Sequence, residues 1–135
     1  MDETPRYTKT WLADGQVLCY RFEDTTTRTV DAWASDLIQE FESWPSDRPW
    51  RLMIDIRLRG NVVSPYALRR ARDIARLRPE LPGRLAILIG SRLAAQIISI
   101  ALRGAPNLYR QRSFFVSEPM AVAWLMEASK DAGTS

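Results

Sequence analysis

The sequence contains no histidine and a single cysteine, and each shortage removes a class of function. Histidine is the commonest general base near neutral pH and the commonest metal ligand, so we expect neither a hydrolytic triad nor a zinc site. Cys19 cannot form an internal disulfide, and it lies in an alternating, strand-like stretch where a free thiol is usually buried and inert. We therefore predict no catalytic residue, no metal and no cofactor.

Long hydrophobic runs are also absent. No stretch approaches the roughly 20 apolar residues of a membrane-spanning helix, and the first thirty residues lack the features of a secretory signal. We therefore expect a cytoplasmic protein that is not transmembrane. With 46% hydrophobic and 26% charged residues, the 135-residue chain fits one globular domain. We predict a flexible arm over residues 1–6, the domain over 7–128 and a frayed tail over 129–135.

The charge is distributed unevenly along the chain. Residues 1–47 carry four Lys or Arg against ten Asp or Glu, a net charge of −6, whereas residues 48–117 carry fourteen against three, a net charge of +11. The last eighteen residues carry one against three, which brings the total to +3. This division predicts either internal charge pairing or an acidic partner.

The N-terminal third has the pattern of a hairpin followed by a helix. Residues 9–12 and 16–22 read as two strands that meet at the tight turn of Asp14 and Gly15. Thr29 is a plausible helix cap, and the helix ends at Pro45. An apolar stripe recurs along that helix every three or four residues and predicts its buried face: Val30, Trp33, Leu37, Phe41 and Trp44.

A second unit runs from Trp50 to Arg78. Residues 50–57 are apolar on both faces except for Asp55, which is typical of a central strand covered by helices on both sides. Ser64 is a good N-cap and Pro65 a good first helical residue. The following helix, predicted over 67–78, carries arginines on its outer side.

The same alternation continues to the end of the domain. Residues 84–90 read as a buried strand, residues 92–103 as a helix, residues 109–116 as a strand, and a last helix begins after Ser117. We therefore predict an α/β fold: a single-domain mixed sheet of about five strands, with an N-terminal antiparallel hairpin and then parallel strands, and four helices.

This order of elements resembles the STAS and SpoIIAA-like group of small α/β domains, which includes STAS/SEC14-like proteins. Residues 112–125, RSFFVSEPMAVAWL, look like the closing pattern of SpoIIAA-like sequences, in which phenylalanine is followed by an acidic residue and then Ala-Trp-Leu. The resemblance covers nearly all of residues 7–128. It implies a non-enzymatic regulatory or protein-interaction module.

The resemblance also suggests a switch residue. In anti-sigma-factor antagonists of this group, a strand ends in an aspartate and a regulatory serine follows some nine residues later, and Asp55 and Ser64 match that spacing. The group's Asp-Ser-Ser-Gly is replaced by Val63-Ser64-Pro65-Tyr66. Ser64 is thus a candidate phosphorylation switch or a plain helix cap.

Arginines around the second helix form a candidate anion-binding face. Its members are Arg57, Arg59, Arg69, Arg72 and Arg76. Their spacing suits phosphate, an acidic protein or anionic lipid, and it also suits a solvated face partly neutralised by acids of the preceding helix. No aromatic stacking platform is interleaved with them, so we expect no nucleic-acid binding.

The helix over 92–103 is unusually apolar, because only Gln96 and Ser99 are polar between its terminal arginines. The side chains that cannot all face the sheet form a candidate interface or apolar groove: Leu93, Ile97, Ile100 and Leu102. We expect a homodimer or a protein partner there. The alternative is a small hydrophobic ligand or anionic lipid, since SpoIIAA-like domains are similar to the lipid-carrying CRAL-TRIO fold. A third hypothesis is an enzyme that uses Asp55 with nearby arginines at the carboxyl end of its strand.

Overall fold

The computed structural model describes residues 4–57, 63–103 and 110–127. They form a mixed sheet in which β1 pairs antiparallel with β2 and the other strands run parallel, in the order β1-β2-β3-β4-β5. The strands are β1 (Tyr7–Leu12), β2 (Val17–Phe22), β3 (Trp50–Asp55), β4 (Gly83–Leu88) and β5 (Arg110–Phe115). The predicted α/β fold is confirmed. The predicted tail from residue 129 lies outside the described residues.

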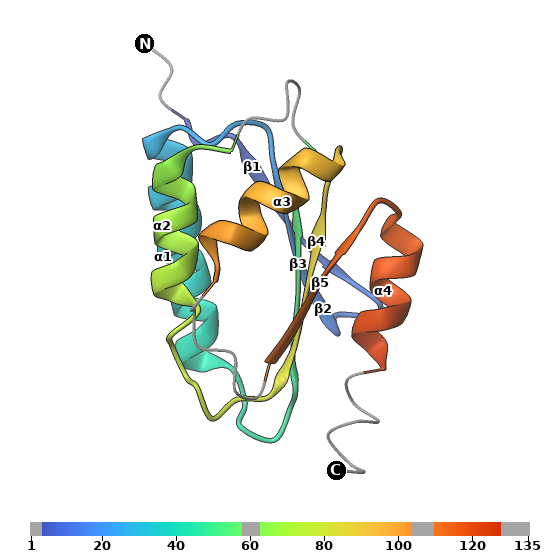
Figure 1. Ribbon diagram of the computed structural model, residues 1–135. Coiled ribbons are helices and arrows are strands. Elements are labelled where there is room, and N and C mark those ends of the chain that lie inside the picture. The colour runs from blue at the N-terminus through green and yellow to red at the C-terminus, as the bar shows by residue number, and fades with distance from the viewer. Residues whose placement is uncertain (1–3, 58–62, 104–109, 128–135) are drawn as a thin grey trace.

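The helices divide unequally between the two faces of the sheet (Figure 1). Three of them, α1 (Thr27–Ser43), α2 (Pro65–Ile74) and α3 (Arg92–Ala101), cover one face. Each connects two parallel neighbouring strands, and crossovers of one hand put such helices on the same side. The last helix, α4 (Glu118–Met126), follows the final strand and covers the other face.

Alternation along the strands separates two apolar cores. Leu18 and Tyr20 of β2 point into the larger core beneath α1, α2 and α3, whereas Val17 and Cys19 point into the smaller one beneath α4. This is the division expected from successive side chains on opposite faces of a strand. β3 contributes Leu52 to the first core and Met53 to the second, which confirms its prediction as a strand covered on both sides.

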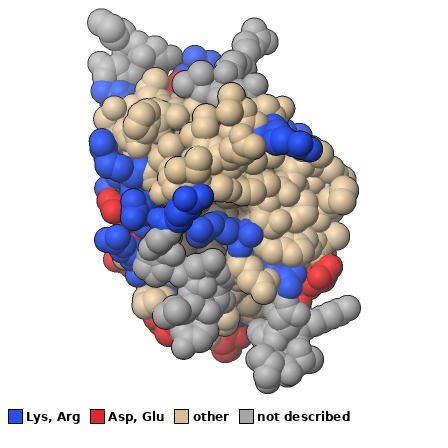
Figure 2. All heavy atoms as spheres, viewed as in Figure 1, with Lys and Arg blue, Asp and Glu red and all other residues tan. Residues whose placement is uncertain are grey.

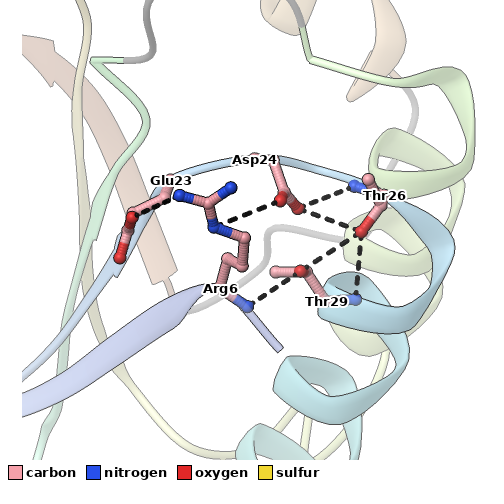
Figure 3. A network of polar contacts seen from close by, with 5 residues as sticks. All are labelled: Arg6, Glu23, Asp24, Thr26 and Thr29. Atoms are coloured by element: carbon pink, nitrogen blue, oxygen red, sulfur yellow. Dashed lines mark hydrogen bonds and ion pairs between the residues drawn. The ribbon is translucent and has the colours of Figure 1, made fainter. Parts of the chain in front are cut away.

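The first helix begins earlier than predicted. Its N-cap is Thr26 rather than Thr29, and the Thr26 hydroxyl accepts from the backbone N–H of Thr29. Asp24 orients this cap by accepting from the backbone and hydroxyl of Thr26 (Figure 3). Thr29 instead accepts from the backbone N–H of Arg6 at 3.0 Å, and Arg6 forms an ion pair with Glu23 at 3.1 Å. Arg6, predicted to lie in a flexible arm, is therefore bonded to the domain.

The second helix ends at Ile74, four residues before its predicted end at Arg78. Arg78 adopts a left-handed backbone conformation with φ of 46°, which cannot continue a helix. Its guanidinium donates to the carbonyl oxygens of Phe41 and Trp44 at 2.9 and 2.8 Å. Because the last carbonyls of a helix lack partners within it, Arg78 stabilises the C-terminus of α1.

Candidate functional site

A network of ion pairs lies where β2 and β3 end, and we call its four members, Arg21, Asp55, Arg57 and Glu118, the Asp55 network. Asp55 accepts from Arg21 at 2.8 Å and from the guanidinium of Arg57 at 2.8 and 3.0 Å. Arg21 also pairs with Glu118, the first residue of α4. The network therefore ties two strands to the helix that covers them.

Asp55 is buried in this network, with 8% of its surface exposed. Burial alone would raise its pKa, but hydrogen bonds from Arg57 and Arg21 outweigh that effect and hold the pKa of Asp55 below its ordinary value. A carboxylate with a lowered pKa and occupied oxygens is a weak proton acceptor. Chemistry at Asp55 would first require separating these ion pairs.

Ser64 caps α2 as predicted and is engaged twice more. Its hydroxyl accepts from the backbone N–H of Ala67 at 3.1 Å and donates to the carbonyl of Thr25 at 2.8 Å. The Thr25 hydroxyl in turn accepts from the backbone N–H of Ser64 at 2.9 Å. These bonds join the start of α2 to the segment that precedes α1. Phosphorylation of Ser64 would remove its hydroxyl hydrogen, so the hydrogen bond to the carbonyl oxygen of Thr25 would be lost.

The predicted anion-binding arginines differ in the contacts that they make. Arg57 is committed to Asp55, and Arg69 lies over the ring of Tyr66 with its guanidinium carbon 5.8 Å from the ring centre. Arg59 lies outside the described residues. Arg72 and Arg76 are exposed and form no ion pair with any residue that the structure describes.

Neutralisation of these arginines by α1 is not observed within the described ranges. The α1 acids Asp36 and Glu40 both pair with Lys9 of β1, and Asp31 accepts from the hydroxyl of Tyr66. The acidic helix is thus bonded to the hairpin and to the start of α2. Arg72 and Arg76 stay available to an anion.

Three apolar side chains of α3 form an exposed row, here called the α3 stripe. Leu93, Ile97 and Ile100 are 64%, 46% and 62% exposed. Leu102 differs from its prediction as a surface residue, because it is 5% exposed and joins the larger core. It is the C-cap residue of α3.

A cavity of about 140 Å³ lies on the inner side of the same helix, between the sheet and α1, α2 and α3. Ile98 and Leu102 line it, but none of the α3 stripe does. Of the four residues predicted to form an interface or an apolar groove, only Leu102 lines this cavity, and the three residues of the α3 stripe lie on the outer surface. The sequence showed that α3 has more apolar residues than one sheet-facing side can hold. It could not show which of them line the cavity and which are exposed to solvent.

Two buried arginines on the α4 face were not singled out from the sequence. Arg51 and Arg84 are register partners on β3 and β4, and both are buried. Arg84 donates to the carbonyl of Trp124 at 2.7 Å and lies over its ring, whereas Arg51 donates to Gln16 at 2.9 Å. Their sequence signal is weak, because it consists of an arginine near the start of an otherwise apolar strand.

The thiol of Cys19 is fully buried, as predicted. Burial raises the pKa of Cys19 to about 11, so the thiolate is scarce at neutral pH. Within residues 4–57, 63–103 and 110–127, no group of three Cys, Asp or Glu side chains is placed to hold a metal ion. No helix in these ranges has the length and apolar character needed to cross a bilayer.

Comparisons with protein-family models, with curated proteins and with solved structures found no match for this chain. The resemblance to STAS and SpoIIAA-like domains therefore stays a prediction. It is carried by the order of the elements and by the closing segment, residues 112–125.

Proposed function

We propose that this protein is a non-enzymatic binding module that contacts a partner protein through the α3 stripe, in the manner of regulatory modules of STAS type. The observation that carries the proposal is the exposure of Leu93, Ile97 and Ile100. They recur at intervals of four and three residues, so they share one side of the helix. Contiguous exposed apolar side chains of this kind mark contact surfaces.

Basic residues border the stripe. Arg92 opens α3 and Arg103 follows its last turn, and both are exposed. α2 packs beside α3 and carries the exposed Arg72, and the exposed Arg76 follows the end of α2. Figure 2 shows basic side chains along the α2 side of this face and across the end of α3, next to an uncharged surface. α3 itself contains no acidic residue.

This distribution of charge supports an acidic, amphipathic partner. A helix with an apolar stripe and flanking carboxylates would bury Ile97 and Ile100 and bring acids to Arg92 and Arg103. A twofold contact between two α3 stripes would instead bring like charges together, which opposes association. The predicted homodimer therefore needs its own test by light scattering, with Ile100→Glu as the disruptive variant.

Two designed peptides provide a direct test. Both form amphipathic helices with the same leucine stripe, and one carries glutamate and the other lysine on its flanks. In an NMR titration at low salt, we expect the glutamate peptide to perturb α3 amides and to bind at least about tenfold more tightly than the lysine peptide. The double variant Ile97→Ser, Ile100→Ser should lose this binding.

A matched control comes from the opposite face. Met120 of α4 is 63% exposed, so Met120→Ser removes a comparable apolar side chain without touching α3. Equal loss of peptide binding in Met120→Ser, or no difference between the two peptides, would contradict the proposal. Binding to phosphatidylglycerol vesicles without binding to the glutamate peptide would favour the alternative function, contact with anionic lipid.

A further inference from the structure

The cavity between the sheet and the three helices has walls from many elements. Strands β2, β3, β4 and β5 contribute its floor, through side chains such as Phe22, Leu52 and Ile87. Trp33 of α1, Ala71 of α2 and Ile98 of α3 belong to the opposite wall. The cavity is therefore formed jointly by the sheet and the three helices. Figure 1 shows these helices lying over one face of the sheet.

The lining is almost entirely carbon. Its polar members are Thr25, Gln111 and Arg112, and it contains no Asp, Glu or Lys. The Thr25 hydroxyl already accepts from Ser64, and Arg112 donates to the carbonyl of Leu102 at 3.1 Å. A molecule in this space would meet aliphatic and aromatic groups over nearly all of its surface. That environment selects against ions and strongly polar molecules.

Small residues of the α2 segment help to create the space. Ala67, Ala71 and Ala75 are four residues apart, so they lie on one side of α2 and its C-cap, and all three line the cavity. A leucine at any of these positions would extend toward the sheet. Protein interiors normally pack without voids much larger than a water molecule. Here the short side chains of the three alanines leave unfilled a space that larger apolar side chains would occupy.

We propose that this cavity is a binding site for a small, uncharged apolar molecule of roughly the size of benzene to indole. An engineered apolar cavity of about 150 Å³ in another protein stays dry and binds benzene. The cavity described here, about 140 Å³ in volume, is similar in size and in its apolar lining, and it is partly open to solvent. The site is distinct from the proposed partner surface, because Leu93, Ile97 and Ile100 do not line it.

Toluene and indole are suitable probes, and the full chain is titrated with each. Trp33 and Trp50 line the cavity, so tryptophan fluorescence reports toluene binding, and NMR spectra report either probe. We expect saturable binding with shifts confined to residues of the cavity wall. Ala71→Phe places a ring in the cavity and should weaken binding by at least about tenfold.

Ala123→Phe is the matched control, because Ala123 is exposed on α4, on the other side of the sheet. It should bind both probes as the unchanged protein does. If Ala71→Phe fails to fold, the smaller change Ala71→Val provides the same comparison with a smaller expected loss. Absence of saturable binding to the unchanged protein, or equal binding in a folded Ala71→Phe variant, would overturn the proposal. Neither result bears on binding through the α3 stripe.

Discussion

The sheet has one face covered by three helices and one face covered by a single helix, and the two differ in packing and in charge. Beneath α1, α2 and α3 the core is wide and apolar and contains the cavity. Beneath α4 the core is smaller, with Ala121 and Leu125 fully buried. Charged side chains lie at both ends of this second face, in the Asp55 network and at Arg51 and Arg84.

The difference follows from how much of the sheet each layer can cover. A single nine-residue helix is too short to cover the full length of the strands, and charged side chains at the ends of β2, β3 and β4 pack beside it on that face. Arg84 shows the effect, because its guanidinium lies over the ring of Trp124 and donates to a carbonyl at the end of α4. On the other face, three helices cover the sheet but do not fill all the space beneath them, and the cavity remains.

The largest expected effect is at the Asp55 network. Asp55→Asn leaves Arg21 and Arg57 without their shared carboxylate, and we expect a loss of about 3 kcal/mol in the free energy of unfolding at pH 7. Urea denaturation measures this loss. The matched control is Asp47→Asn, the same change at an exposed position in the loop before β3, which should alter stability by less than about 0.5 kcal/mol.

The effect of Asp55→Asn on stability should also depend on pH. Burial opposes ionisation of Asp55, but its arginine partners prevail and its pKa in the folded protein lies below the ordinary 3.8. Its contribution to stability is therefore complete above the ordinary pKa and is lost as pH falls through the folded pKa. The stability difference between the unchanged protein and Asp55→Asn should shrink below about pH 4. A difference that stays constant with pH would contradict this assignment.

One substitution placed on each face tests the difference in packing. Ala121→Leu enlarges a fully buried residue in the smaller core and should destabilise the protein by about 1–3 kcal/mol. Ala71→Leu enlarges a residue that lines the cavity and should be neutral or stabilising by up to about 1 kcal/mol. Thermal unfolding of the two variants measures the change in stability that each substitution causes. Effects of the same sign and size would mean that the faces pack alike.

Removing a helix cap on each face should produce a smaller difference in stability. Ser64→Ala removes a hydroxyl that caps α2 and also donates to Thr25, so we expect a loss of about 1–2 kcal/mol. Ser117→Ala removes only the α4 cap, whose hydrogen bond to the backbone of Met120 is long at 3.4 Å, and should cost about 0.5 kcal/mol. Chemical denaturation compares them, and equal losses would argue against the second role of Ser64.

The smallest effects are expected on the α3 stripe. Ile97→Ser and Ile100→Ser replace side chains that are 46% and 62% exposed, so each should change the free energy of unfolding by no more than about 0.5 kcal/mol. Leu102→Ser, two residues beyond the stripe but in the core, should be clearly destabilising. If Ile97→Ser destabilised the protein as much as Leu102→Ser, the stripe would belong to the fold rather than to a contact surface.

Much of the fold could be predicted because its signals are local. The alternation of β2, the apolar stripe of α1 and the Ser64-Pro65 start of α2 each depend on residues a few positions apart. The errors in helix boundaries arise where contacts between residues distant in sequence decide the outcome. Thr26 and Thr29 are equally suitable caps by residue type, and only the contacts of Asp24 and Arg6 distinguish them.

The sequence by itself determined the order of the elements, the two faces of each strand and the excess of apolar residues in α3. Only the tertiary structure decided which arginines have partners distant in sequence, since Arg21 of β2 bonds Asp55 of β3 and Arg78 donates to the end of α1. It also divided α3 between a cavity wall at Leu102 and an exposed stripe at Ile97. Periodicity records that a side chain is apolar, whereas the packing of distant elements decides what it contacts.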